Sequence, residues 1–167
     1  MAKAMEPALS APPKPAVPDA DVMDAMQGQP PSAKKQMGVV DIIRKSFSQH
    51  GELGDFNTFM KKLGSLLLDK NNSTVQMGNT VFLLQRTAPD TVEVHTFSSE
   101  TPQNLIKNYV GIAKFLKNQG IKRAVTYADS PGYVEIAKKT GLPVKVGQTI
   151  KTMGGKAKPM YTFELEL

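Results

Sequence analysis

Two stretches early in the chain carry apolar residues at helical spacing. Residues 39–50 place four apolar side chains on one stripe: Val39, Ile42, Ile43 and Phe47. The stretch 56–70 places six on a second stripe: Phe56, Phe59, Met60, Leu63, Leu66 and Leu67. Asp55 precedes this stretch, at a position where its carboxylate can accept a hydrogen bond from a free backbone N–H. The pattern predicts two amphipathic helices, each with one buried face.

The segments that follow are predicted to be strands, and apolar and polar residues alternate clearly in 91–97 and 161–167. A hairpin turn is expected at Gly78-Asn79, between strands 73–78 and 80–87. In 91–97, one face carries Val92, Val94 and Thr96, and the opposite face carries Glu93, His95 and Phe97. Three more strands are predicted, the last two joined by a Gly154-Gly155 turn: 121–129, 146–153 and 161–167.

The clearest helix is predicted at 102–119. Thr101 occupies the N-cap position, Pro102 the first helical position, and Gly120 follows the last turn. A shorter helix is expected between Ser130, assigned as its cap, and Gly141. The order of elements is therefore ααβββαβαββ. This order predicts a mixed α/β (α+β) fold whose sheet is largely antiparallel and flanked by helices.

Proline is concentrated at the start of the chain. Seven of the 12 prolines fall within residues 1–37, where four lysines balance four acidic residues. A Pro/Ala-rich segment without aromatic residues buries too little apolar surface to offset its conformational entropy. We therefore expect an extended N-terminal arm at 1–37 and a globular domain at 38–167, which carries the whole formal charge of +6.

One part of this arm has a helical pattern. In residues 19–27, Asp19 can cap a short helix that places Val22, Met23 and Met26 on one face. So short a helix does not hold by itself in water. Two interpretations stay open: a linker with a few apolar residues, or a docking segment that folds in a groove of a partner.

Composition excludes several classes of site. The chain of 167 residues has no cysteine, so it has no disulfide, thiolate metal site or cysteine nucleophile. Its two histidines, His50 and His95, cannot build a zinc set by themselves, and no metal site is expected. No apolar run reaches the length of about 18 residues that a membrane helix needs. We expect a soluble protein without a secretory signal.

The predicted order of elements over residues 38–167 resembles the GCN5-related N-acetyltransferase (GNAT) fold, most clearly between Val92 and Leu142. Active members of this family cradle the pyrophosphate of acetyl-CoA on a Gln/Arg-x-x-Gly-x-Gly/Ala loop before the central helix. Here that stretch reads SSETPQN, from Ser98 to Asn104. It has no glycine, its proline has no N–H, and Glu100 adds negative charge. The sequence therefore predicts that no cofactor is bound.

A second motif of the family supplies a tyrosine that protonates the leaving thiolate. Aligned on Gly141-Leu142, that position holds Ala137. An enzyme would need substitutes, and the candidates are Tyr127 or Tyr133 as the acid and Glu93 or His95 as the base. Its cofactor would lie against the loop residues Ser98, Ser99 and Thr101.

The missing motifs favour a non-catalytic structural or assembly protein. Degenerate domains resembling GNATs occur in tailed-phage virions, and this resemblance implies a tail, portal-associated or internal protein located in the virion after synthesis in the host cytoplasm. Its partners would be other subunits, bound through the N-terminal arm, with the chain itself homo-oligomeric in the assembly. The first alternative is an active N-acetyltransferase using acetyl-CoA. The second is a basic DNA-associated protein making weak, salt-sensitive contacts.

Overall fold

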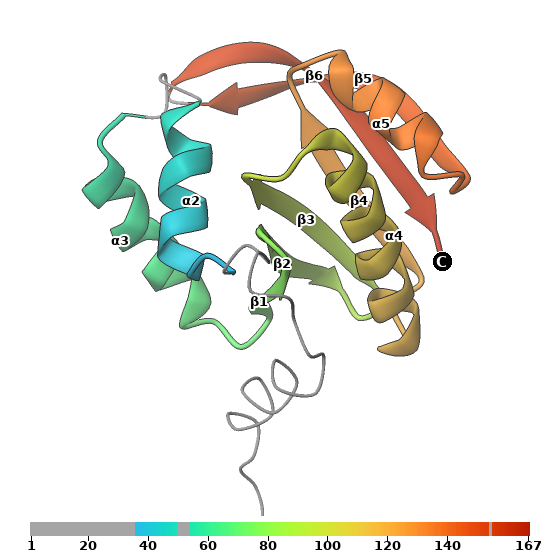
Figure 1. The fold of residues 1–167 in the computed structure, drawn as a ribbon, viewed down its shortest axis with the longest axis horizontal. Helices are drawn as coiled ribbons and strands as arrows, with labels where there is room; N and C mark the ends of the chain where they lie inside the picture. Colours follow the sequence, from blue (N-terminus) through green and yellow to red (C-terminus); the bar gives the residue numbers. More distant parts are fainter. Residues whose placement is uncertain (1–35, 50–53, 154) are drawn as a thin grey trace, which may run out of the picture. The chain divides into compact units, whose positions relative to one another are not determined.

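A computed structural model describes residues 36–49, 54–153 and 155–167 (Figure 1). The chain divides into two units, Met1–Lys35 and Gln36–Leu167, and the helices and strands of these ranges all belong to the second. The predicted docking helix at 19–27, with Val22, Met23 and Met26, lies outside the described residues. Gln36 and Met37 already contact the domain, since Met37 N–H donates to Asn79 Oδ1 at 2.9 Å.

The two amphipathic helices form where their apolar stripes predict them, as α2 (Val39–Ser48) and α3 (Phe56–Leu67). Asp55 caps α3, accepting a hydrogen bond from Thr58 N at 2.9 Å. The α3 helix ends before residue 70 because Asn72 Nδ2 donates to the Leu66 carbonyl at 2.7 Å, which satisfies an end group of the helix. The prediction of a buried stripe was wrong for Val39, Leu66 and Leu67, whose side chains are exposed.

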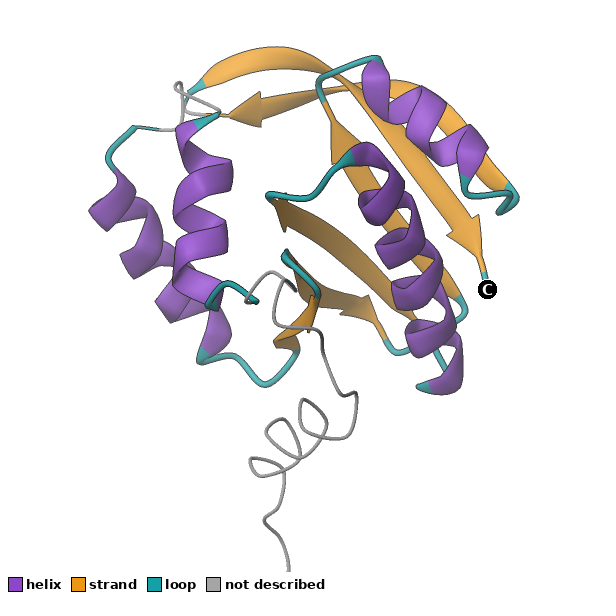
Figure 2. Ribbon diagram, in the orientation of Figure 1, coloured by secondary structure: helices purple, strands orange, loops and turns teal. Residues whose placement is uncertain are grey.

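Six strands form one sheet in the order β1-β2-β3-β4-β6-β5 (Figure 2). Their bounds are β1 Asn72–Met77, β2 Thr80–Ala88, β3 Thr91–Ser98, β4 Arg123–Ala128, β5 Val144–Met153 and β6 Lys156–Glu166. All neighbouring pairs are antiparallel except β3 and β4, which are parallel. The structure confirms the predicted mixed α/β fold and its largely antiparallel sheet.

Two further helices, α4 (Pro102–Asn118) and α5 (Gly132–Lys139), complete the order of elements. Thr101 caps α4 as predicted. The assignment of Ser130 as the cap of α5 was wrong by one position, because Pro131 is the N-cap residue. Ser130 Oγ still accepts a hydrogen bond from Gly132 N at 3.3 Å, so this hydroxyl serves the turn before the helix.

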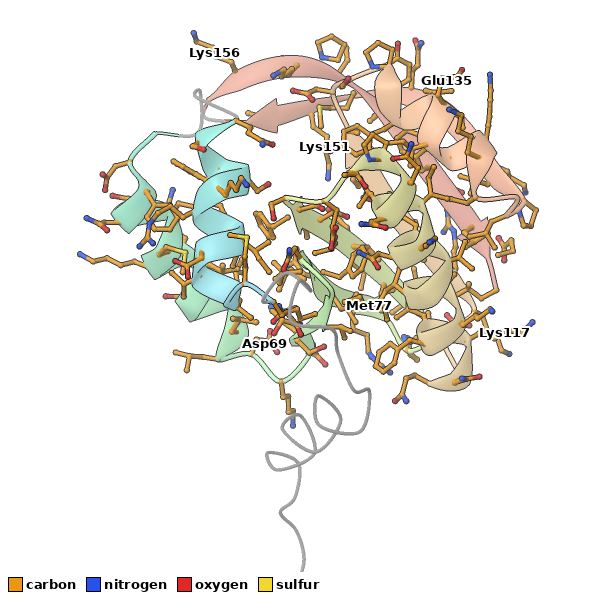
Figure 3. The ribbon with its side chains drawn as sticks, in the orientation of Figure 1. Asp69, Met77, Lys117, Glu135, Lys151 and Lys156 are labelled. Atoms are coloured by element: carbon orange, nitrogen blue, oxygen red, sulfur yellow. The ribbon has the colours of Figure 1, made fainter. Side chains whose placement is uncertain are left out.

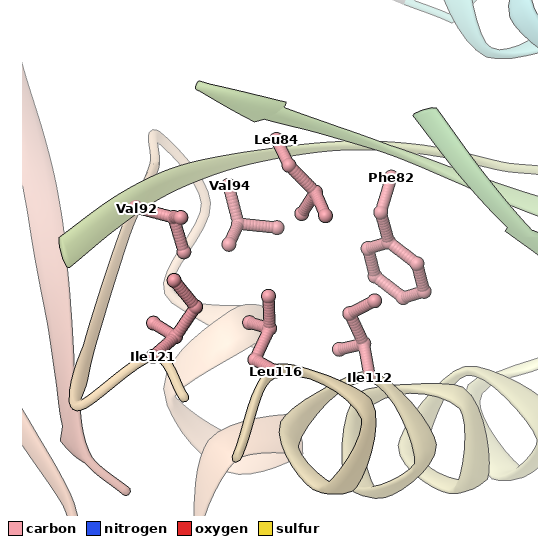
Figure 4. Packing of buried hydrophobic residues seen from close by; sticks show 7 residues of the cluster. All are labelled: Phe82, Leu84, Val92, Val94, Ile112, Leu116 and Ile121. Carbon is pink, nitrogen blue, oxygen red and sulfur yellow. The ribbon is translucent and has the colours of Figure 1, made fainter. Parts of the chain in front are cut away.

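The two faces of the sheet carry separate apolar clusters. On one face, the strands and α4 enclose Phe82, Leu84, Val92, Val94, Ile112, Leu116 and Ile121 (Figure 4). On the other face, Ile43 of α2 and Leu63 of α3 pack against Leu83 of β2, with Phe97 of β3 beside them. The predicted split of β3 into two faces is confirmed, since Val94 and Phe97 belong to opposite clusters. None of the helices in the described ranges is long and apolar enough to cross a membrane.

The β1–β2 turn depends on a glycine. Gly78 has φ +58°, and a Cβ on it would lie 2.7 Å from Glu100 Oε1. We expect Gly78→Ala to lower the free energy of unfolding by about 1–2 kcal/mol, because it adds backbone strain and displaces the carboxylate. Urea titration measures the change.

Gly64→Ala is the matched control. Gly64 lies inside α3, and a Cβ added at this position would have no atom within 4 Å. Alanine there removes conformational freedom from the unfolded chain, so we expect a gain of about 0.5–1 kcal/mol. Equal losses in the two variants would contradict the assignment of strain to Gly78.

Candidate functional site

A cleft opens where strands β3 and β4 stop pairing. Their parallel register covers three pairs and ends at Glu93 and Val125, although both strands continue beyond it. A cavity of about 1300 Å³ is lined there by residues of both strands, including Val94, Thr96, Thr126 and Tyr127. We call this the β3–β4 cleft. Figure 2 shows the two strands diverging toward the N-terminal end of α4.

The edge of β3 presents backbone groups to this cleft. Thr126 Oγ1 donates to the Val94 carbonyl at 2.6 Å, so that carbonyl points toward β4. Because the direction of backbone N–H and C=O groups alternates along a strand, those of Thr96 face the same way. The cleft therefore has a strand edge that can pair with an extended, amide-containing ligand.

Helices α4 and α5 line the cleft from the side. The residues that face it are Tyr133, Ile136 and Ala137 of α5 and Thr140, the C-cap of that helix. Burial raises the pKa of Tyr133, and the charge of Asp129 raises it further, so its phenol stays protonated at neutral pH. Ala137, one helical turn after Tyr133, brings no hydroxyl to the cleft. Of the two predicted substitutes for the missing acid, Tyr133 comes from α5 itself, and Tyr127 comes from β4.

A polar cluster lies on the face of the sheet that α2 and α3 cover. It consists of Gln85, Glu93, His95, Tyr127 and Lys151, from four different strands. Lys151 Nζ lies 3.1 Å from Glu93 Oε1 and 3.4 Å from the centre of the Tyr127 ring. His95 Nε2 lies 2.6 Å from Gln85 Oε1 and 3.4 Å from Glu93 Oε1. Figure 3 labels Lys151 on β5, which of these four strands lies farthest from β3 in the strand order of the sheet.

The surroundings of His95 favour a neutral imidazole. Burial is the main cause that lowers its pKa below 6.5; Glu93 acts in the opposite direction, and Lys151 lowers the pKa further. Both oxygens beside Nε2 are acceptors, so Nε2 carries the proton and Nδ1 holds a free lone pair. His95 can therefore accept a proton at neutral pH. The candidate bases Glu93 and His95 lie together, and each touches the other.

The predicted cofactor-binding residues Ser98, Ser99 and Thr101 make hydrogen bonds within the chain. Ser98 Oγ accepts from Glu100 N at 3.1 Å and bonds Thr80 Oγ1 at 2.8 Å. Ser99 N donates to the Asn79 carbonyl at 3.0 Å, and Thr101 Oγ1 accepts from Asn104 N. The strand β3 and α4 are thus joined by a loop that directs its backbone donors inward.

This arrangement does not fit the pyrophosphate of CoA. A diphosphate cradle needs several backbone N–H groups that point at the ligand. In this loop the N–H groups of Ser99, Glu100 and Asn104 have partners within the chain, and Pro102 has none to offer. The Glu100 carboxylate adds a charge of the same sign as the phosphates. No reaction step is therefore derived through CoA.

Sequence reasoning missed Gln85 and Lys151. Nothing in the neighbouring sequence distinguishes either residue from a solvent-facing one, and Lys151 lies 58 positions from its partner Glu93. In the part of the chain that the structure covers, no group of three or more His, Cys, Asp or Glu side chains could hold a metal ion.

Comparison with known proteins identifies the fold. No protein-family model matches the sequence, and no curated protein matches it. Among solved structures, a chimera of spermidine N-acetyltransferase from Vibrio cholerae has a TM-score of 0.54 at 9% identity, covering 79% of this chain and 95% of that one. A probable GNAT-family acetyltransferase from Chromobacterium violaceum has a TM-score of 0.52 at 13% identity, covering 68% of each chain. A phosphinothricin N-acetyltransferase-like structure has a TM-score of 0.50 at 16% identity, covering 80% and 96%. The chain therefore has the GCN5-related N-acetyltransferase fold.

Proposed function

We propose that the protein transfers an acyl group from a thioester, bound in the β3–β4 cleft, to an amine. One observation carries this proposal: the diverging strand edges lie beside a neutral, oriented His95. The fold similarity to acetyltransferases supports the same class of reaction, at the level of fold alone. The enzymatic alternative thus has better support than the non-catalytic function that the sequence favoured.

Different residues remove the proton from the amine, orient the base and protonate the leaving group. His95 takes the proton that the attacking amine loses as its C–N bond forms and the C–S bond of the thioester breaks. Glu93 and Gln85 hold the ring in the tautomer that leaves Nδ1 free. Tyr133 of α5 can return a proton to the leaving thiolate, and burial keeps it protonated until that step.

Thiol release tests the proposal directly. The chain has no cysteine, so any thiol detected with a chromogenic disulfide comes from the thioester. We expect release to depend on an added amine, supplied in turn as spermidine, lysine and a peptide with a free N-terminus. Absence of amine-dependent release with every acceptor, together with absence of thioester binding at millimolar concentration, would contradict the proposal.

A second candidate is a non-catalytic assembly protein, of the kind found in tailed-phage virions, bound to neighbouring subunits through residues 1–37. The observation that favours it is the loop from Ser98 to Asn104, whose bonding within the chain removes a hallmark of catalysis in this fold. Deleting residues 1–35 should then leave the domain folded and abolish its incorporation into the assembly. Normal incorporation of the deleted protein would count against this candidate.

A further inference from the structure

We propose that the donor of this protein is an acyl thioester without a nucleotide diphosphate, because the Glu100 carboxylate of the chain already occupies the anion position at the start of α4. This inference rests on the proposed acyl transfer. It names the chemical class of the donor: a pantetheine-type thioester, which has amides and a thiol but no adenosine diphosphate.

The contacts of Glu100 account for both of its carboxylate oxygens. Oε1 accepts from Asn79 N–H in the β1–β2 turn at 2.6 Å, and Oε2 accepts from Asn104 Nδ2 in the first turn of α4 at 3.2 Å. A helix N-terminus and a turn amide are the donors that bind phosphate in other proteins. Here the Glu100 carboxylate already binds the turn amide of Asn79, and through the Asn104 side chain its negative charge lies beside the first turn of α4.

The backbone of Glu100 is tied to the core. Ser98 Oγ, which accepts from Glu100 N–H, is bonded to Thr80 Oγ1, and Thr80 is fully buried. Asn108 Nδ2 of α4 also donates to Thr80 Oγ1 and to the Met77 carbonyl, both at 3.0 Å. Moving the loop aside for a diphosphate would leave buried polar groups without partners, at a cost of about 1–3 kcal/mol for each.

The segment before α2 adds a second obstruction. Met37 N–H donates to Asn79 Oδ1, and Ser99 Oγ lies 3.4 Å from Met37 Sδ. Gln76 Nε2 donates to the Met37 carbonyl at 2.8 Å. Residue 37 therefore lies directly against the turn and the loop that a nucleotide would need to reach.

The β3–β4 cleft itself remains suited to the donor arm. The Thr96 edge of β3 can pair with amides of an extended chain, and the cavity of about 1300 Å³ accommodates a pantetheine arm and an acyl group. The charged nucleotide is the part of acetyl-CoA that this site does not accommodate. Acetyl-CoA should thus gain no affinity from it.

Calorimetry with two probes tests the inference on the full chain. We expect acetyl-CoA to bind less than about threefold more tightly than S-acetyl-pantetheine, since the nucleotide adds no favourable contact. Tighter binding of acetyl-CoA by more than about threefold overturns the inference and leaves the acyl-transfer proposal standing. If neither probe binds, both the inference and the acyl-transfer proposal are overturned. The failure of the inference alone is thus distinguishable from the failure of the proposed function.

A charge-removing variant sharpens the result. Glu100→Gln keeps an oxygen for Asn79 N–H but removes the negative charge, so acetyl-CoA should bind about fivefold more tightly while S-acetyl-pantetheine is unchanged. Glu135→Gln, on the exposed side of α5, is the matched control and should change neither affinity. An unchanged affinity for acetyl-CoA in folded Glu100→Gln overturns the inference. The comparison of the two probes on the unmodified protein does not depend on whether this variant folds.

Discussion

Replacing His95 with asparagine is expected to lower the rate of amine-dependent thiol release by about 100-fold or more, the usual contribution of a general base. Asparagine keeps a polar side chain beside Gln85 but has no group that accepts a proton at neutral pH. Steady-state kinetics with S-acetyl-pantetheine measures the loss. The fall should appear in kcat, with little change in the affinity for the thioester, because the amides of the donor pair with the strand edge and not with the His95 ring.

The pH profile separates catalysis by His95 from a structural role. Activity requires neutral His95, so the rate should rise with pH through a pKa below 6.5. The Glu93 charge raises that pKa and the Lys151 charge lowers it. Glu93→Gln should therefore shift the acidic limb of the profile to lower pH, and Lys151→Gln should shift it to higher pH. Shifts in the same direction, or full activity in His95→Asn, would contradict the assignment.

Phe82→Ala is expected to lower the free energy of unfolding by about 3–5 kcal/mol. Phe82 is fully buried on β2, its ring centre lies 5.7 Å from that of Tyr109, and it packs in the cluster beneath α4. The truncation leaves a cavity between α4 and the sheet that rigid neighbours cannot fill. Urea denaturation measures the loss.

Leu68→Ala serves as the control for this loss. Leu68 follows α3 and is 87% exposed, so its truncation should change stability by no more than about 0.5 kcal/mol. A loss below about 1 kcal/mol for Phe82→Ala would mean that α4 does not pack on β2 as described.

The helices and strands were predictable because their signals are local. Thr101 caps α4 through a residue three positions away, and the alternation along β3 is visible in eight consecutive residues. The sequence also identified the loop from Ser98 to Asn104 as unsuited to phosphate. What it could not reveal was the partner of Glu100, because Asn79 lies 21 positions away in a different turn.

The candidate site was only partly predictable, for the same reason. Glu93 and His95 were recognised together because they share one strand and one face. Lys151 joins them through the strand order β4-β6-β5, which depends on how strands far apart in the chain pair. Likewise, the end of pairing between β3 and β4 has no local signature. Both strands have the composition of strands that pair along their whole length.

The hydrogen bonds of Gln36 and Met37 have a mechanical consequence. They tie the last residues before α2 to Gln76, Gly78 and Asn79, at the β1–β2 turn. A pulling force applied along residues 1–35 would therefore act first on that turn. The force would act on α2 only after these hydrogen bonds break. The turn is itself held to α4 through Glu100. A pull on the N-terminal segment would thus be transmitted through this turn to the loop between β3 and α4.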